Sequence, residues 1–521
     1  MRHLIVCCDG TWNTTGALDA TTNVRRLHNA LAETAEDGAK QLRYYHSGVG
    51  AGGGLTDWIM GGITGAGLSR NVLDAYQWLT TNYQKGDRIA LFGFSRGAYT
   101  VRSVAGMVAS CGLIDITCRA ESAIRRAIEH IYQCKYKMGQ KADPLWRDGL
   151  SFSFDPENAD QIPVHFIGVW ETVGALGIPN YLGGLNLLDS PRRYAFHDVR
   201  LNPHVRFARH ALAMDEGHVQ FTPTLWSDPA LGQDVEQVWF PGSHLDVGGG
   251  YLQTGLSDGA LQWMIEQATK TIGLGFQPKM IADQISPDPR GDLHDLTLSA
   301  LGLLGPALEP MLEPFLPRRP RAVPRIDPDA ESRSLDRSVY ERHENPPITG
   351  APYRRTQVLA AGESMTVRVV AHEPWNETGV YLEAGHYRFA AQGEWVDGNI
   401  RSGPAGSTGL RRFLPAEARQ LGGTLIGVGV QLFRRVSGNN VAEAIFSRRE
   451  LDLPWMSLVG VVANDAIAIG AGQYQHERIA IGAGAEHQVC RDGYLYAYAN
   501  DAWGRYSNNW GDVSLTVTRM A

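Results

Sequence analysis

The sequence predicts an α/β fold, in which a mainly parallel sheet carries helices on both faces, followed by an all-β sandwich. Two observations support this prediction. From residue 1 to about residue 357, strand-like and helix-like segments alternate, as they do in parallel sheets covered by helices. After residue 358, short alternating runs are separated by glycine, asparagine and aspartate, which is typical of antiparallel sheets. We therefore expect two domains, residues 1–357 and 358–521.

Hydrophobic periodicity places the elements of the first domain. Short apolar runs predict strands, at Leu4–Cys8, Leu42–Tyr45, Ile89–Phe94, Val164–Val169 and Val235–Phe240. Apolar residues at helical spacing predict helices, at Val72–Tyr83, Arg96–Ser110, Ala120–Tyr136 and Ser257–Ile272, with Ser257 as an N-cap. The proline- and arginine-rich segment Pro317–Pro328 is expected to run over the surface.

The second domain has a different pattern of apolar and polar residues. Alternating apolar and polar residues predict strands, at Met365–Val370, Tyr387–Ala391, Arg478–Ile481, Tyr494–Tyr498 and Val513–Val517. An insertion of mixed, partly helical character, Leu410–Arg449, interrupts these strands.

Composition narrows the class of protein. The chain has 521 residues, of which 43 % are hydrophobic and 20 % charged, as in globular proteins with real cores. A net charge of −7 argues against nucleic acid as a partner. Six cysteines without a C-x-x-C spacing indicate free thiols and folding in a reducing compartment. Because the start Arg2–Cys8 is strand-like, we expect no signal peptide, and the apolar runs are too short to predict a membrane span.

The strongest local signal is a serine at a sharp turn. Gly93-Phe94-Ser95-Arg96-Gly97 follows an apolar strand and opens a helix, which is the pattern G-x-S-x-G of a nucleophile elbow. The elbow lifts the Ser95 hydroxyl clear of the sheet, and the helix N-terminus favours negative charge beside it. The alternative is a structural strand–helix turn.

A serine nucleophile needs a base and an acid that orients this base. In an α/β-hydrolase-like sheet these residues follow in the order serine, acid, histidine, on loops after strands. His244 follows the expected strand Val235–Phe240 and Glu171 follows Val164–Val169, so we predict them as base and acid. The alternatives for the orienting acid are Asp246, Asp215 and Asp198.

The oxyanion of the tetrahedral intermediate needs N–H donors. The backbone N–H of Arg96 is the first candidate, and the second is Gly10 or Thr11, after the first strand. The alternative for that loop is a turn stabilised by the side chains of Asp9 and Asn13. Histidines and carboxylates do not recur at metal-ligand spacing, so we expect no cofactor for catalysis.

Five ordered motifs also carry a family resemblance over about Met1–Tyr353. CDGTWN, GFSRGAYTVR, GVWETVGALG, ARHALAMDE and the run from SHLDVGGGY to LQWM resemble bacterial phospholipase effectors of the first type VI secretion lipase family. The resemblance implies an α/β-hydrolase-like fold, with Ser95 as nucleophile, His244 as base and Glu171 where the family usually has aspartate.

The resemblance also implies an activity and partners. It implies phospholipase A activity on membrane glycerophospholipids, synthesis in the cytoplasm, and type VI delivery into the envelope of a target bacterium as a toxin. A spike protein of the secretion apparatus and a cognate immunity protein would be the partners. The loops Gly48–Leu68, Val173–Leu188 and Leu301–Leu316 would form an apolar rim that admits lipid. The alternatives are an esterase on non-lipid esters, and a carbohydrate-binding adhesin with an inactive hydrolase scaffold.

The end of the chain suggests a calcium site. The loop from Ala499 to Gly511 is rich in asparagine and carries one carboxylate, and hard oxygen ligands of this kind suit calcium, although such hairpins are often plain turns. The loop resembles that of small calcium-dependent galactose-binding bacterial lectins, and Trp375–Gly398 resembles their first hairpin. The match implies five ligands and a possible sugar ligand that shares the ion; the five are Asp397, Asp501, Arg505 through its carbonyl, Asn508 and Asn509.

Overall fold

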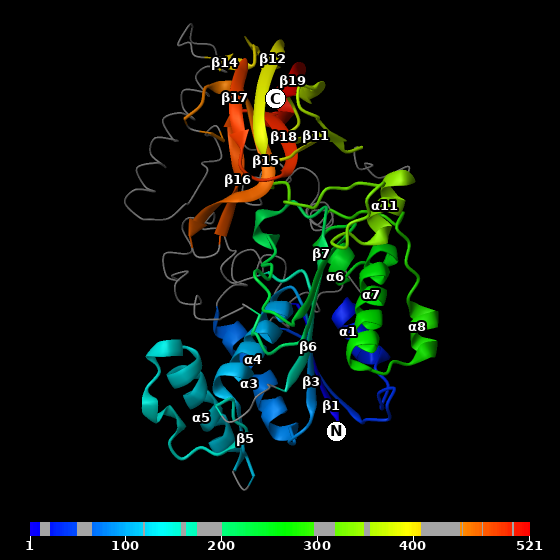
Figure 1. The fold of residues 1–521 in the computed structure, drawn as a ribbon, viewed down its shortest axis with the longest axis vertical. Coiled ribbons are helices and arrows are strands. Elements are labelled where there is room, and N and C mark those ends of the chain that lie inside the picture. The colour runs from blue at the N-terminus through cyan, green and yellow to red at the C-terminus, as the bar shows by residue number, and fades with distance from the viewer. Residues whose placement is uncertain are drawn as a thin grey trace.

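The computed structural model describes residues 1–10, 21–48, 65–117, 120–157, 163–173, 201–295, 318–347, 355–407, 449–450, 452–470, 473–502 and 505–520. The three loops of the expected apolar rim lie mainly outside these residues, and so does the predicted insertion Leu410–Arg449. An α/β part that contains the N-terminus occupies one end of the molecule, and a β part that contains the C-terminus occupies the other (Figure 1).

The α/β part is built on a six-stranded sheet. In spatial order its strands are β2 (Gln41–His46), β1 (His3–Cys8), β3 (Arg88–Phe94), β6 (Val164–Trp170), β7 (Phe207–Ala213) and β8 (Asp234–Phe240). Every neighbouring pair is parallel, which confirms the predicted parallel sheet. The carboxyl ends of all six strands therefore meet at one edge, where residues that follow each strand come together.

Helices cover both faces of this sheet (Figure 1). Alternate residues of β1 point into two different cores, because successive side chains of a strand face opposite sides. One core is shared with α3 (Gly65–Asn82) and α4 (Arg96–Cys111), and the other with α1 (Asn23–Ala30) and α7 (Gly255–Ile272). The other α-helices of the described residues are α5 (Glu121–Ile131), α6 (His244–Gly248), α8 (Pro278–Gln284) and α11 (Arg337–Glu344).

Short elements complete the described chain. Strands β4 (Leu113–Ile114) and β5 (Phe152–Phe154) pair with each other. A π-helical turn spans Tyr132–Tyr136, and 3-10 turns span Gly139–Lys141, Pro144–Arg147, Val219–Phe221 and Tyr506–Asn508. Among the described helices, none has the length and apolar character needed to cross a bilayer.

Two local predictions for the α/β part are wrong. The helix α7 begins at Gly255, not at an N-cap Ser257, whose hydroxyl donates to the carbonyl of Thr254 at 3.0 Å. The segment Pro317–Pro328 does not simply run over the surface, because Arg321 and Ile326 are 9 % and 5 % exposed. The buried Arg321 side chain pairs with a carboxylate, and the Ile326 side chain packs in a core cluster with Trp239.

The β part holds two facing sheets. One contains β10 (Ser364–Val370), β19 (Asn509–Arg519), β12 (Gly385–Asp397), β13 (Ile400–Ser402) and β17 (Gly484–Val489). The other contains β14 (Ala405–Ser407), β15 (Trp455–Gly470), β16 (Gln473–Ala480), β18 (Gly493–Ala499), β11 (Asn376–Leu382) and β9 (Gln357–Val358). Both sheets contribute to one apolar core, which confirms the predicted β sandwich.

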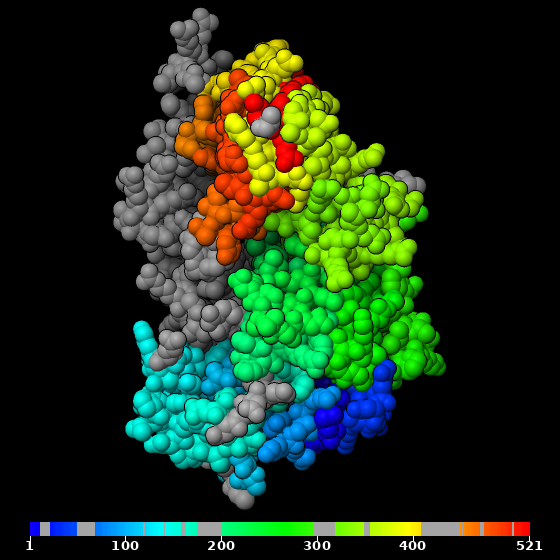
Figure 2. All heavy atoms as spheres, viewed as in Figure 1, coloured from blue at the N-terminus to red at the C-terminus, as the bar shows by residue number. Residues whose placement is uncertain are grey.

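The two parts are packed against each other. In Figure 2 the β part, in yellow to red, sits directly on the green segments of the α/β part. Ile326 donates its N–H to the hydroxyl of Tyr494 in β18 at 2.9 Å, and this bond is buried. The segment that precedes α11 is therefore held by the sandwich.

Candidate active site

Ser95 stands at the predicted elbow between β3 and α4. Its backbone has φ 55° and ψ −118°, a conformation that non-glycine residues rarely adopt. The glycines on either side allow this turn, because a Cβ on Gly93 would lie 2.5 Å from the Gly97 carbonyl oxygen. A Cβ on Gly97 would lie 2.0 Å from the carbonyl oxygen of Cys8 in β1. The Ser95 side chain makes no helix-capping hydrogen bond.

Glu171 and His244 meet at the same edge of the sheet. Glu171 directly follows β6, the neighbour of β3, and His244 opens α6 just beyond β8. Oε2 of Glu171 lies 3.1 Å from Nδ1 of His244, and the two side chains are 0 % and 1 % exposed. Like Ser95, Glu171 has a positive φ, 45°. The parallel topology thus brings the predicted acid to the predicted base across 73 positions of sequence.

The alternative acids lie elsewhere. Asp246 is bonded to His294, whose Nδ1 is 2.7 Å from its Oδ1. Asp215 accepts a hydrogen bond from the N–H of Gly242 at 2.7 Å. Asp198 lies outside the described residues. Among the described acids considered from the sequence, Glu171 is the one hydrogen-bonded to the His244 ring.

Arg321 binds the carboxylate of Glu171 through two hydrogen bonds. Its Nη1 donates to Oε1 at 2.9 Å and its Nη2 to Oε2 at 2.8 Å, a bidentate pair. Arg321 also donates to the carbonyls of Ala213 and Phe221, at 2.6 and 2.7 Å. Burial by itself raises the pKa of Glu171, but the charge and hydrogen bonds of Arg321 and His244 outweigh it and lower this pKa to about 2. Glu171 is therefore a carboxylate at any physiological pH.

The sequence did not reveal Arg321 as part of this site. It lies 150 positions after Glu171, in a segment whose prolines and arginines indicated exposed chain. Arginine-rich composition gave no sign that one of these side chains turns inward. The one hint in the sequence was the predicted acid, Glu171. A carboxylate that becomes fully buried needs a cationic partner or several hydrogen-bond donors.

The His244 ring is held between aromatic side chains. Its centroid lies 4.8 Å from that of Phe94 and 4.4 Å from that of Phe221, and Glu216 accepts its backbone N–H at 3.1 Å. Its Nε2 is buried and has no hydrogen-bond partner among the described residues, so no Ser95–His244 hydrogen bond is formed here. Such bonds are often long without substrate and shorten in the Michaelis complex. Since Phe94 directly precedes Ser95, the ring contact places the imidazole beside the elbow.

The predicted oxyanion donors have different environments. Arg96 is the first residue of α4, so its N–H lies at a helix N-terminus. A Cβ on Gly10 would lie 3.4 Å from that of Ser95, so the first loop contacts the nucleophile. The N–H of Gly10, however, donates to Oδ1 of Asp9 at 2.8 Å. This contact agrees with the alternative prediction that the Asp9 side chain stabilises a turn in this loop. Thr11 lies outside the described residues.

The predicted calcium ligands of the β part also gather. Nδ2 of Asn508 lies 2.5 Å from Oδ1 of Asp397, and Nδ2 of Asn509 donates to Oδ2 of Asp501 at 2.8 Å. Burial and the nearby charge of Asp397 raise the pKa of Asp501 to about 7. Oδ1 of Asn509 is buried without a hydrogen-bond partner in the described structure. Two close carboxylates and an unpaired amide oxygen are a donor set that fits a hard cation.

The fifth predicted ligand, Arg505, precedes the 3-10 turn Tyr506–Asn508, and its carbonyl accepts the N–H of Asn508 at 3.3 Å. Within the described residues there is no group of three or more histidine, cysteine or carboxylate side chains placed for one metal. A cation at this loop would therefore depend on amide and carbonyl oxygens as well as on carboxylates.

Comparisons with known proteins match the part of the chain that contains the candidate site. The family model for the catalytic domain of type VI secretion system phospholipase effectors like Tle1 matches residues 2–267, which include Ser95, Glu171 and His244. An uncharacterised protein of Saccharomyces cerevisiae is 27 % identical over 240 residues, 42 % of this chain and 32 % of that protein. The chain thus spans about a third of the length of this curated relative.

Two solved structures have weaker likeness. The Tle1 effector bound to the VgrG spike of the type VI secretion system is 19 % identical, with a TM-score of 0.26, covering 49 % of this chain and 51 % of that one. The N-terminal domain of EclA, a PllA-like lectin, is also 19 % identical, with a TM-score of 0.18, covering 30 % of this chain and 94 % of that one. The family model covers just over half of the 521 residues, and the chain therefore belongs, through its catalytic domain, to the Tle1-like phospholipase effectors of type VI secretion systems.

Proposed function

We propose that this chain is a serine ester hydrolase that cleaves acyl esters of membrane glycerophospholipids with Ser95, His244 and Glu171. The observation that carries the proposal is the buried Glu171–His244 hydrogen bond at 3.1 Å, one strand away from a serine with strained backbone. Such strain persists where the surrounding structure enforces it, and it gathers at active sites. Membership of the phospholipase effector family supports lipid as the substrate.

The proposed mechanism assigns one step to each of these groups. Oγ of Ser95 attacks the acyl carbonyl while Nε2 of His244 takes the hydroxyl proton. The resulting oxyanion is stabilised by the N–H of Arg96 at the start of α4. His244 then protonates the leaving alcohol, and a water molecule releases the fatty acid from the acyl-enzyme by the reverse sequence. Glu171 keeps Nδ1–H of His244 oriented and stabilises the imidazolium.

The family supports a role between bacteria. We infer that the chain is delivered by a type VI secretion system, in association with a spike protein, into the envelope of a competing bacterium. Phospholipid hydrolysis there would damage the membrane, and the producing cell would need an immunity protein against its own enzyme.

Covalent labelling tests the nucleophile and the substrate class together. A fluorophosphonate should modify Ser95, because such reagents react with activated serines. Peptide mass spectrometry will identify the modified residue. The wild-type protein should release fatty acid from phosphatidylethanolamine–phosphatidylglycerol vesicles faster than it hydrolyses a soluble short-chain ester. Faster hydrolysis of the soluble ester would instead identify an esterase on non-lipid esters. An unlabelled Ser95 would contradict the proposed enzyme and favour an inactive scaffold.

A second proposal concerns the β part. We propose that Asp397, Asp501, Asn508, Asn509 and the carbonyl of Arg505 bind a calcium ion. Oδ1 of Asn509 supports this proposal. The residue is 4 % exposed, and a buried amide oxygen without a hydrogen-bond partner lowers the stability of the fold unless a ligand satisfies it. Calcium would neutralise the two carboxylates and fix the loop, on which a sugar hydroxyl could then complete the coordination.

Calcium binding should weaken as the pH falls. With a pKa of about 7, Asp501 is mostly protonated at pH 6 and mostly ionised at pH 8, and only the ionised form is a good ligand. The calcium dissociation constant should therefore rise about tenfold from pH 8 to pH 6, as isothermal titration calorimetry of the full chain will measure. Asp501→Asn should bind weakly and with little pH dependence. An affinity equal at both pH values would contradict the assignment of Asp501, and galactose added to the calcium-loaded protein tests the sugar.

A further inference from the structure

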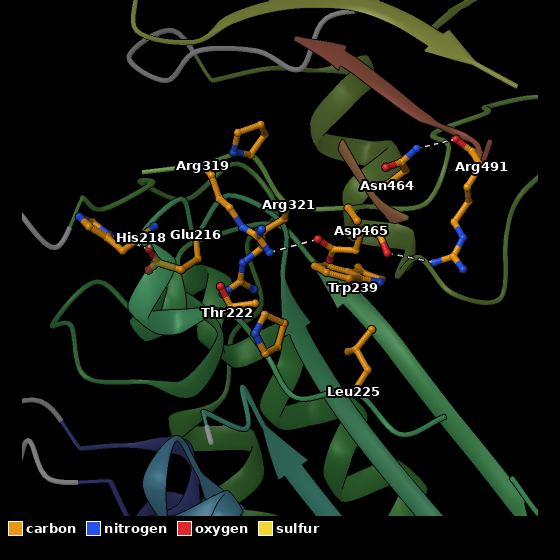
Figure 3. Close-up of a pocket in the computed structure, with 13 residues that line it drawn as sticks. Glu216, His218, Thr222, Leu225, Trp239, Arg319, Arg321, Asn464, Asp465 and Arg491 are labelled. Atoms are coloured by element: carbon orange, nitrogen blue, oxygen red, sulfur yellow. Dashed lines mark hydrogen bonds and ion pairs between the residues drawn. The ribbon is translucent and has the colours of Figure 1, made fainter. Parts of the chain in front are cut away.

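A segment between the two parts of the molecule reaches into the active site. Residues 318–327, here called the strap, precede α11 of the α/β part and are held by the β part on one side (Figure 3). The indole N–H of Trp375 donates to the carbonyl of Arg318 at 2.8 Å. Nε2 of His476 in β16 donates to the carbonyl of Pro320 at 2.7 Å. The carbonyls on both sides of Arg319 are thus bonded to side chains of the sandwich.

The side chain of Arg319 strengthens this hold. It reaches across a cavity of about 250 Å³ to Oδ1 of Asp465, at 3.1 Å, as Figure 3 shows. Asp465 lies where the register of β15 against β16 is irregular, and its φ is 45°. An irregularity of this kind re-aims a side chain out of the strand pattern. Here the re-aimed carboxylate meets the strap.

The α/β part holds the opposite side of the strap. Arg319 donates its N–H to the carbonyl of Gly217 at 2.7 Å, and Arg318 forms a β-bridge with His218. Two residues after Arg319, the side chain of Arg321 enters the α/β part and forms its bidentate pair with Glu171. The backbone that carries Arg321 is therefore fixed between the sandwich and the catalytic domain, directly before the position where its guanidinium meets the triad acid.

We propose that Arg321 is a positioning residue for Glu171, and that the β part sets the geometry of the triad by holding the strap. This inference rests on the proposed function. Arg321 contacts Glu171, which contacts the base, so it acts on the reaction through two side chains. A shift of the sandwich that moved Pro320 or Arg319 would move this arginine too, and a displacement of about 1 Å in such a positioning shell can cost about 10²-fold in rate.

The first arm of the test changes the arginine. In the full chain, Arg321→Gln should lower kcat on phospholipid vesicles by about 10²-fold with little change in KM. Without the guanidinium charge, the pKa of Glu171 rises, so the acid limb of the pH–rate profile should move to higher pH. Arg321→Lys keeps the charge and should restore the position of the limb while recovering only part of the rate. A merely structural role would leave this limb in place.

The second arm changes only the hold of the β part. Asp465→Asn removes the ion pair with Arg319, and we expect kcat and the fluorophosphonate labelling rate of Ser95 to fall roughly 3- to 10-fold. Asp512→Asn is the matched control, because it breaks a β-part ion pair, to Arg368 at 2.7 Å, that is remote from the strap, and its rate should equal that of wild type.

The outcomes separate the proposals. Equal rates for Asp465→Asn and Asp512→Asn would overturn the role of the β part. A folded Arg321→Gln protein with an unchanged acid limb and rate would overturn the role of Arg321, although labelling of wild-type Ser95 would still support the enzyme. A wild-type protein without labelling would overturn the proposed function and this inference with it. Thermal unfolding of each variant establishes that it is folded.

Discussion

Replacing Ser95 with alanine is expected to reduce fatty-acid release from phospholipid vesicles by at least about 10³-fold while the fold stays intact. The hydroxyl makes no capping bond, so its loss removes no structural hydrogen bond of the helix. The substitution retains the Cβ and removes only the attacking atom. The residual rate would come from the remaining N–H donor and from substrate binding. Quantifying free fatty acid against time for both proteins gives the measurement.

The same variant tests the antibacterial role. Exported to the periplasm of a Gram-negative host, the wild-type chain should stop growth and permeabilise the inner membrane, and Ser95→Ala should do neither at equal expression. Ser110→Ala, at the far end of α4, is a matched control that should keep full activity, since the Ser110 hydroxyl contacts the carbonyl of Gly106 and the thiol of Cys111 and no residue of the proposed triad. Toxicity that survives in Ser95→Ala would refute the link between hydrolysis and killing.

Replacing Glu171 with glutamine is expected to lower kcat by about 10⁴-fold. The carboxylate accepts from His244, Arg321 and the N–H of Ala213, all while fully buried. A glutamine can accept at only one of its two terminal atoms, and its amide N–H₂ would face a donor. Arg321 loses one acceptor in either orientation of the amide. In addition, either Nδ1–H of His244 loses its acceptor, which permits the wrong tautomer, or the N–H of Ala213 does. Single-turnover rates and kcat with the same vesicles measure the loss.

Glu171→Asp is the informative companion variant. It keeps the charge but shortens the side chain by one methylene, and we expect a rate between those of wild type and glutamine. The positive φ of this position remains, so both variants share the same backbone strain. If Glu171→Gln were folded and kept its rate within threefold of wild type, another group would have to orient His244, and the proposed triad would be wrong.

Much of the α/β part could be predicted because its signals are local. The elbow needs two glycines around one serine, and buried parallel strands are short apolar runs. Strand β7 was missed because its centre reads Arg209-His210. Arg209 donates to Gln267 and to the carbonyl of Asp234, and Nε2 of His210 accepts the N–H of Thr172, so both are buried with partners. Burial lowers the pKa of His210 to about 3, so this ring is neutral.

Other features depend on contacts between distant segments. No periodicity links Arg321 to Glu171, and only the assembled sheet and strap bring them together. The position of Gly10 after the first strand made it a reasonable oxyanion donor. Its N–H instead meets the carboxylate of Asp9, and the side-chain torsion that decides this contact cannot be predicted from the sequence. Conversely, the His244–Glu171 pairing followed from chain order alone, because parallel strands deliver their following loops to one edge.

The backbone at the ends of β3 and β6 has a consequence for evolution. Two adjacent strands are each followed directly by a non-glycine residue with positive φ, and each such residue costs on the order of 1–3 kcal/mol. Glycine at position 95 would relieve that cost while removing the nucleophile, whereas glycine at position 171 would also leave the buried Arg321 without its carboxylate and destabilise the fold. A lineage that lost its need for hydrolysis would therefore gain stability from glycine at the first turn alone, because the acid at the second turn also neutralises a buried arginine.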